Sequence, residues 1–377
     1  MSDAVSYFNE VLKAAGESGT SDVHIKAGSP VTFRISRKLV SGEFIPDQAW
    51  MSELIDNICP KHLKPGLDAE RETDFSYLCP GVGRFRTNVF QALGRWCIVM
   101  RLVKNQVPSM EQLGLPDILK TIAESPRGII LMAGTTGSGK STTLAAMLEH
   151  LNSNLRKHIV TLEDPIEFTF EENQCIIEQR ELSLDTMTFQ RGMKSALRQD
   201  PDIIMVGEMR DLDTAQIAIQ ASLTGHFVLT TLHTNDAPGA VTRLVDMGVE
   251  PFLISSSIMG VIAQRLVRTV CKQCRAPYEP TEAQLSMLQL TAHEIGDKSF
   301  YFGRGCENCN DTGYRGRKGI YELLKINDDV RTLINERAPG MVIKQRAMEK
   351  GMRTIRQDGL QAIFDGLTTV EEVIKYT

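Results

Sequence analysis

Residues 134–141 read Gly-Thr-Thr-Gly-Ser-Gly-Lys-Ser, which matches the phosphate-binding pattern Gly-x-x-x-x-Gly-Lys-Ser/Thr at every fixed position. The six residues before it, Gly128-Ile-Ile-Leu-Met-Ala133, form an apolar run of buried-strand length. Residues 142–151 carry Ala and Leu at helical spacing. Strand, loop and helix therefore follow one another in the order that a nucleotide site requires. A chance match in a Gly-rich turn would lack this context.

The residue types of the loop predict its chemistry. Glycines let backbone N–H groups turn inward around phosphates, and a helix N-terminus favours negative charge. Lys140 is placed to reach the β and γ phosphates, and Ser141 to ligate Mg²⁺. We therefore expect ATP or GTP with Mg²⁺ at a site formed by Gly134, Thr135, Thr136, Gly137, Ser138, Gly139, Lys140, Ser141 and Thr142.

The composition is that of a globular protein with ordinary cores. The chain has 377 residues, of which 42% are hydrophobic, and a net charge of −5. The negative charge argues against a protein whose main role is to neutralise nucleic-acid phosphates, so we expect no nucleic-acid partner. The sequence contains neither an uncharged apolar run of about 18 residues nor an export signal, which predicts a cytoplasmic location.

Two domains of α/β class are expected on either side of a linker. Residues 1–103 combine an amphipathic helix with alternating strands and predict a small mixed α/β domain. Residues 104–117 contain two prolines and a glycine between a strand and a helix, and we interpret them as an interdomain linker that acts as a hinge. Residues 118–377 form the nucleotide-binding domain, which ends in helices.

Four apolar strands alternate with helical segments in the second domain, a pattern typical of a parallel sheet covered by helices. Ligands of such sheets bind at the carboxyl ends of the strands, where the phosphate loop, Glu163, Glu208 and His233 all fall. The predicted strands are 128–133, 158–162, 202–206 and 227–232.

Two carboxylates at strand ends are candidates for catalysis. Glu163 follows one strand and fits the role of orienting an attacking water, although an acidic turn that caps a helix has the same pattern. Glu208 follows Ile203-Ile-Met-Val-Gly207 and resembles a Walker B acid displaced by one residue, which predicts a contact with Mg²⁺. Asp202 begins that strand, and we interpret it as structural.

The segment from Thr224 to Thr234 contains His226 and His233. Their odd separation puts them on opposite faces of a regular strand, so they are not expected to chelate one metal. A single histidine beside a strand is most often a core or surface residue. His233 falls at the edge of the sheet where the phosphate loop is expected, and is therefore the stronger candidate for sensing the γ-phosphate.

A second centre is predicted from two Cys-x-x-Cys pairs, Cys271 with Cys274 and Cys306 with Cys309. Four cysteines at this spacing are typical of a tetrahedral zinc site, and four protein ligands leave no vacancy for water, which indicates a structural role. Two disulfides or four unbound thiols are the alternatives. The zinc-binding element is expected to span 271–320.

The first domain carries a cluster of basic residues on two adjacent predicted strands. Such a cluster is usually a solvated face of a sheet. In a nucleotide-driven motor, a small hinged domain is also well placed to deliver arginines to the γ-phosphate. Both interpretations stay open for Arg84, Arg86, Arg95 and Arg101.

Five motifs together resemble the motor ATPases of type II secretion and type IV pili, the GspE, PilB and PilT family, over nearly the whole chain. The resemblance implies a PAS-like first domain, a RecA-like ATPase domain and ATP as the nucleotide. The matching segments are Ser21-Asp-Val-His24, Gly134–Ser141, Thr161–Glu167, Leu197–Arg210 and Thr224–His233.

The resemblance also implies residue roles and partners. It assigns Lys140 and Ser141 to the phosphates and Mg²⁺, Glu163 to catalysis and Glu208 to Walker B. His226 and His233 are assigned to sensing, and Arg86 and Arg101 best match the first-domain arginines of the family. A homohexamer that works under an inner-membrane platform protein is implied, with the motor cytoplasmic and peripheral to that membrane.

Two sequence patterns indicate different directions of action, retraction on one side and assembly or secretion on the other. The short segment before Ser21-Asp-Val-His-Ile-Lys-Ala-Gly-Ser-Pro30 resembles the retraction ATPase PilT. The cysteine quartet and Met352-Arg-Thr-Ile-Arg-Gln-Asp-Gly-Leu360 resemble the assembly and secretion ATPases, which we slightly favour. A RecA-like DNA-dependent ATPase and a nucleotide-dependent scaffold without turnover are the remoter alternatives.

Overall fold

The computed structural model describes residues 3–35, 38–103, 105–290, 295 and 298–377. It divides into two compact units. The first comprises Met1–Gln106 with two later segments, Glu163–Phe170 and Gln179–Thr188. The second comprises Val107–Leu162, Glu171–Glu178 and Phe189–Thr377. The domain limits predicted at 103 and 118 remain predictions, and the two later segments of the first unit were not expected from the sequence.

A six-stranded sheet with the order β3-β2-β1-β6-β5-β4 forms the centre of the first unit. All its neighbouring strands run antiparallel. Its strands are β1 (Thr20–Lys26), β2 (Thr32–Ile35), β3 (Lys38–Ser41), β4 (Glu72–Cys79), β5 (Gly83–Ala92) and β6 (Arg95–Leu102). Its helices are α1 (Asp3–Glu17), α2 (Gln48–Ile58) and α3 (Lys64–Glu70).

Alternation along the strands explains how this unit forms a core on one face of its sheet. Val23 and Ile25 of β1 are buried, as are Ile98 and Met100 of β6. They pack in one cluster with Phe8, Leu12 and Leu54, which come from α1 and α2. Apolar residues at period two therefore meet helices whose apolar residues recur at helical spacing.

A seven-stranded sheet forms the second unit, in the order β15-β12-β7-β11-β10-β8-β9. The strands from β12 to β8 in that order run parallel, whereas β15 pairs antiparallel with β12. The strands are β7 (Gly128–Ala133), β8 (His158–Glu163), β9 (Ile176–Glu181), β10 (Ile203–Val206), β11 (Phe227–Leu232), β12 (Ile258–Val270) and β15 (Tyr314–Lys325).

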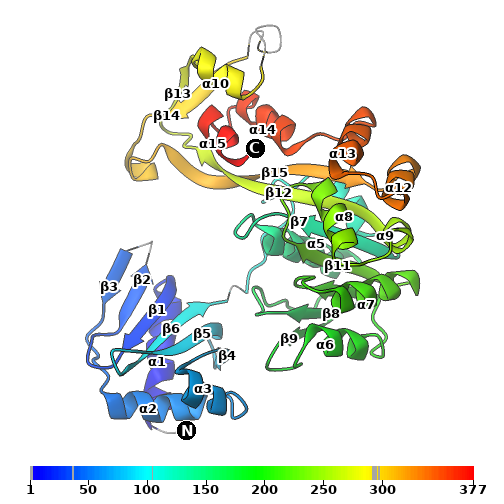
Figure 1. Ribbon diagram of the computed structural model, residues 1–377. Coiled ribbons are helices and arrows are strands. Elements are labelled where there is room, and N and C mark those ends of the chain that lie inside the picture. The colour runs from blue at the N-terminus through cyan, green and yellow to red at the C-terminus, as the bar shows by residue number, and fades with distance from the viewer. Residues whose placement is uncertain (1–2, 36–37, 104, 291–294, 296–297) are drawn as a thin grey trace. The chain divides into compact units, whose positions relative to one another are not determined.

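Helices cover both faces of this sheet because its central strands are apolar along their whole length. Every residue of β7, β10 and β11 is buried, so neither face can remain in water. Figure 1 shows the helices beside these strands. They are α4 (Ile118–Ala123), α5 (Lys140–Asn154), α6 (Phe189–Ala196), α7 (Leu212–Leu223), α8 (Ala237–Asp246) and α9 (Pro251–Ser257).

The strands β12 and β15 form a long hairpin that carries the C-terminal third (Figure 1). A small hairpin of β13 (Arg275–Tyr278) and β14 (Phe300–Gly303) lies in its connection. The remaining helices are α10 (Glu282–Met287), the 3-10 turn Glu307–Cys309, α12 (Asp328–Asn335), α13 (Gly340–Glu349), α14 (Ile355–Phe364) and α15 (Val370–Tyr376). The predicted α/β class with a parallel sheet in the second unit and a helical end is thus confirmed.

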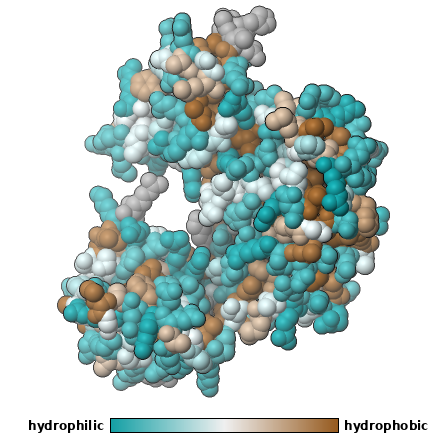
Figure 2. All heavy atoms as spheres, in the orientation of Figure 1, coloured by the Kyte–Doolittle hydropathy of each residue, from teal (hydrophilic) through white to brown (hydrophobic). Residues whose placement is uncertain are grey.

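Among the described helices, none combines the length and the apolar character needed to cross a membrane. On the face drawn in Figure 2, hydrophobic residues form small patches within a mostly hydrophilic surface.

The core of the first unit can be tested with its own fluorescence, because the two tryptophans of the chain, Trp50 and Trp96, both lie in this unit. We expect Ile98→Ala to lower the free energy of unfolding by about 2–5 kcal/mol, since the fully buried side chain would leave a cavity. Leu78→Ala is the control: Leu78 is 69% exposed, and its loss should change the value by less than about 0.5 kcal/mol. Urea titration of tryptophan emission measures both, and equal effects would contradict this account of the core.

Candidate nucleotide site and cysteine centre

The phosphate loop connects β7 to α5 through three glycines in conformations that L-residues avoid. The φ angles of Gly134, Gly137 and Gly139 are 153°, 77° and 89°. At Gly134, a Cβ atom would lie 2.7 Å from the carbonyl oxygen of Gln264. Two of the loop's glycines thus also allow close packing, since a Cβ at Gly139 would lie 2.8 Å from Gln264 Nε2.

Lys140 begins α5 and is buried over the loop. Its ammonium group donates to the carbonyl oxygens of Gly134 at 2.8 Å and Thr135 at 3.2 Å. The N-cap residue of this 15-residue helix, Gly139, makes no side-chain cap bond. Within the described chain, the buried Ser138 hydroxyl oxygen has no hydrogen-bond partner. A charged lysine, a helix N-terminus and an unpaired hydroxyl together fit phosphate groups with Mg²⁺.

Register places the predicted site segments at one edge of the sheet. Ala133 of β7 is opposite Leu232 of β11, and Val206 of β10 is opposite both Thr230 and Leu162. The phosphate loop follows β7, Glu208 comes two residues after β10 and His233 comes directly after β11, whereas Glu163 is the last residue of β8. The phosphate loop, Glu208 and His233 are therefore brought to one edge of this sheet, while the catalytic roles of these residues and of Glu163 stay predictions.

Glu208 and His233 are in direct contact. Glu208 Oε1 lies 3.2 Å from His233 Nε2, and Glu208 Oε2 accepts a hydrogen bond from Arg210 Nε at 2.7 Å. The backbone behind them is fixed, because Thr231 donates its hydroxyl to the carbonyl oxygen of Gly207 at 2.7 Å. The arginine contact was not expected from the sequence, which gives no signal for a bond across two residues of a loop.

Glu163 ends β8 as a buried carboxylate. Its Oε1 atom accepts a hydrogen bond from Gln179 Nε2 at 3.2 Å, and its Oε2 atom from the backbone N–H of Glu167 at 3.5 Å. Gln179 belongs to β9 and was not identified in the sequence. These bonds orient the carboxylate, which suits either the water-orienting role or the capped acidic turn.

His226 does not join His233. It precedes β11, whereas His233 follows the same strand, and its carbonyl oxygen accepts from the N–H of Gly128 at the start of β7. Its Nδ1 atom lies 2.9 Å from the carbonyl oxygen of Ala221. The strand that lies between the two histidines rises about 3.3 Å per residue, so its own length of about 16 Å is the least distance between them. The structure therefore places His226 away from the phosphate loop of its own chain.

A row of charged residues crosses the first sheet, Arg34, Asp22, Arg101 and Arg86, each opposite the next. Arg101 Nε donates to Asp22 Oδ1 at 2.8 Å. Burial opposes ionisation of Asp22, but hydrogen bonds from Ser21 and Arg101 lower its pKa below the usual value. The Ser21–His24 motif thus holds an arginine in place.

The other two arginines of the cluster, Arg84 and Arg95, do not belong to this row. Arg84 NH2 is 3.1 Å from Glu181 Oε2, a carboxylate of the same unit. Arg95 begins β6, six residues before Arg101, and lies about 20 Å along the strand from it. Arg95 is therefore separated from the row that contains Arg86 and Arg101.

The four predicted cysteines form one cluster. The Sγ atoms of Cys271 and Cys306, and those of Cys274 and Cys309, are 3.8 Å apart, and those of Cys306 and Cys309 are 3.7 Å apart. A tetrahedron with zinc–sulfur bonds of about 2.3 Å has edges of about 3.8 Å. The cluster therefore fits a zinc ion held by four thiolates.

Backbone amides stabilise the thiolates of Cys271 and Cys309, whereas burial raises the pKa of Cys274 to about 11 and also raises the pKa of Cys306. Burial opposes ionisation of Cys271, but N–H groups of Gln273 and Cys274 lower its pKa to about 6. Burial likewise opposes ionisation of Cys309, and the N–H groups of Cys306 and Gly313 lower its pKa. Those two donors lie 3.2 and 3.3 Å from Cys309 Sγ. Donors that face the sulfurs are typical of structural zinc sites.

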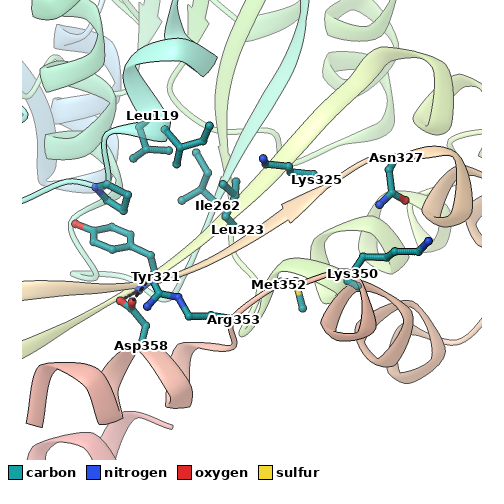
Figure 3. A pocket seen from close by; sticks show the side chains of 14 residues that line it. Leu119, Ile262, Tyr321, Leu323, Lys325, Asn327, Lys350, Met352, Arg353 and Asp358 are labelled. Carbon is teal, nitrogen blue, oxygen red and sulfur yellow. Dashed lines mark hydrogen bonds and ion pairs between the residues drawn. The ribbon is translucent and has the colours of Figure 1, made fainter. Parts of the chain in front are cut away.

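A separate pocket of about 350 Å³ lies in the second unit between α4, the β12–β15 hairpin and the start of α14 (Figure 3). Of the predicted site residues in the described chain, none lines it. Its Lys350 is 2.9 Å from Asp329, and its Arg353 is 3.6 Å from Asp358. Two of the three cations that line the pocket are thus paired with carboxylates, and the third is Lys325.

Comparison with known proteins assigns the family. A family model described as type II/IV secretion system protein matches residues 3–375. The chain belongs to this family. It is 41% identical to the type II secretion system ATPase E of Vibrio cholerae, over 99% of this chain and 75% of that protein. It is 46% identical to the type IV pilus assembly ATPase PilB of Thermus thermophilus, over 74% of this chain and 32% of that protein.

A solved structure of the pilus retraction motor PilT with bound ADP superimposes with a TM-score of 0.79 at 32% identity. The match covers 98% of this chain and 96% of that structure. The predicted resemblance is thus confirmed, and the protein is a P-loop ATPase of the secretion and pilus family. The chain spans less than a third of the Thermus relative.

The zinc assignment can be tested by metal analysis. We expect the purified protein to hold about one equivalent of zinc, and Cys306→Ser to lower this strongly because one of four thiolates is lost. Cys97→Ser is the control, since this buried thiol lies in the first unit and should leave the zinc content unchanged. Less than about half an equivalent in gently prepared wild-type protein contradicts the site.

Proposed function

We propose that this chain hydrolyses Mg·ATP as a hexameric motor for pilus assembly or type II-like secretion. The contact of Glu208 with His233, next to the phosphate loop, carries the proposal. It joins a metal-binding acid to a residue that can respond to the γ-phosphate. The similarity to secretion ATPase E and to PilB supports the assembly or secretion type.

The residues divide the reaction between them. Lys140 and the N-terminus of α5 offset the phosphate charge, while Ser141 and Glu208 would hold Mg²⁺, which supplies further positive charge. Glu163 orients the attacking water through a carboxylate that Gln179 keeps in place. His233 shares a proton or a hydrogen bond with Glu208, and through this contact it responds to the γ-phosphate.

Further groups complete the proposal beyond a single chain. Arg86 and Arg101 would approach the γ-phosphate in a ring of six identical subunits, and the hinge at 104–117 would carry the movement. An inner-membrane platform protein is the proposed partner, which makes the motor cytoplasmic and peripheral to that membrane. The zinc would stiffen the end of the β12–β15 hairpin rather than take part in hydrolysis.

The enzymatic part is tested by Glu208→Gln. We expect this variant to bind ATP as the wild type does but to lose at least about 99% of its turnover, because the amide binds Mg²⁺ poorly. Phosphate release and binding of a fluorescent ATP analogue measure the two quantities. Asp202→Asn is the matched control at the other end of β10, where the Asp202 side chain accepts hydrogen bonds from Lys157 and from the backbone N–H of His158.

That control should keep its kcat within about threefold and lower only stability. Undiminished hydrolysis by Glu208→Gln would exclude Glu208 as the Walker B acid. Binding without turnover in the wild type would indicate the scaffold function instead. Stimulation by single-stranded DNA at about 150 mM salt would indicate a DNA-dependent ATPase.

Retraction is the second candidate for the direction of action. The match to the retraction motor PilT covers nearly the whole of both chains, which favours this alternative. A deletion strain of the source organism separates the cases. Loss of surface filaments indicates an assembly motor, excess filaments a retraction motor, and normal filaments with blocked export a secretion motor.

A further inference from the structure

Two adjacent residues of β12, Gln264 and Arg265, lie between the phosphate loop and the loop that follows His233. Neither belongs to the motifs that identify the nucleotide site. Both are buried although both are polar, and burial of such groups is costly unless specific bonds compensate. Strand β12 runs beside β7, with Ala263 opposite Ala133, so its next residues lie level with the phosphate loop.

Gln264 contacts the phosphate loop and the helix behind it. Its Oε1 atom accepts a hydrogen bond from Thr143 Oγ1 of α5 at 2.8 Å. Its Nε2 atom packs against Gly139, and its carbonyl oxygen packs against Gly134. Gly134 and Gly139 thus both pack against Gln264. The shape of the loop therefore depends on the position of β12.

Arg265 contacts the loop after His233. Its Nη2 atom donates to the carbonyl oxygen of Asn235 at 2.8 Å and to Asn235 Oδ1 at 3.2 Å. Its Nη1 atom donates to the carbonyl oxygen of Gln264 at 3.2 Å. The planar guanidinium therefore ties the backbone two residues beyond His233 to the same carbonyl group that packs against Gly134.

The charges around Arg265 extend this link to the C-terminal helices. Burial lowers the pKa of Arg265, which the nearby Asp236 and Glu322 oppose. Lys344 of α13 lies 3.1 Å from Asp236 and 3.8 Å from Glu322. Glu322 Oε1 also accepts from the N–H of Ala237, the first residue of α8. Two cations and two anions thus surround the loop between β11 and α8.

Successive strand residues point to opposite faces of a sheet, so Gln264 and Arg265 reach different layers of helices. Gln264 bonds α5 on one face, and Arg265 bonds the loop that leads into α8 on the other. A single rigid strand therefore connects the phosphate loop to the His233 loop through the sheet.

We propose that Gln264 and Arg265 are positioning residues: Gln264 sets the phosphate loop for nucleotide binding, and Arg265 holds the His233 loop so that His233 meets Glu208. The inference rests on the proposed ATPase function for its kinetic consequences, but not for its effect on binding. Neither residue touches the nucleotide in this scheme, and the two act on different steps.

The test separates binding from turnover. Gln264→Leu should weaken binding of a fluorescent ADP analogue at least about threefold and raise KM, because the loop loses its support. Arg265→Gln should leave that affinity within about twofold but lower kcat at least about tenfold. Arg243→Gln, an exposed arginine of α8, is the matched control and should change neither value. The opposite split, or no change in either variant, overturns the proposal.

A double-mutant cycle with His233→Ala tests whether Arg265 acts through His233. If it does, Arg265→Gln should lower kcat no further in the His233→Ala background, whereas two independent multiplicative effects contradict the proposal. Circular dichroism and zinc content check folding. If Arg265→Gln does not fold, the same cycle with Arg265→Lys decides, because lysine keeps the charge but loses the planar fork.

Wild-type turnover is measured first, so that failure of the two ideas can be told apart. Absent turnover in the wild type counts against the proposed function alone. In that case the ADP affinities of Gln264→Leu and Arg265→Gln still test the positioning of the phosphate loop. Equal affinities of wild type and Gln264→Leu then overturn the inference.

Discussion

Backbone pairing of β7 with β11 and β12 is the constraint on which the second unit depends. These parallel hydrogen bonds bring the ends of distant segments level, so that the phosphate loop, His233 and Gln264 meet at one edge. The strands are apolar throughout and can exist only when helices cover both faces. A shift of one residue in this register would move every contact of the site to the other face.

The site combines local chemistry with support from further along the chain. The phosphate loop has its own glycines, lysine and helix N-terminus, but its glycines rest on Gln264, which comes 125 residues after Gly139. Glu208 is likewise held between a neighbour in its own loop, Arg210, and a histidine from another strand. The phosphate loop, Glu208 and His233 therefore depend on the whole sheet, because they follow three of its central strands, β7, β10 and β11.

The first unit contributes a different kind of surface. Its sheet buries apolar residues under α1 and α2 and presents Arg34, Asp22, Arg101 and Arg86 in one row on paired strands. The Asp22 carboxylate holds Arg101 in a defined position. With three arginines and one aspartate, this row has a net positive charge.

The sequence by itself determined the α/β class, the phosphate loop, the cysteine quartet and the strand ends at Glu163, Glu208 and His233, because each depends on residues close together in the chain. The resemblance of five motifs to those of a known family also predicted the family. Local spacing missed Gln179, Arg210, Gln264 and Arg265, whose partners are chosen by packing. It also grouped His226 with His233 and Arg95 with Arg101, although the residues of each pair lie near opposite ends of one strand. Only the tertiary structure decides such contacts, because register and burial between distant strands set which polar groups meet.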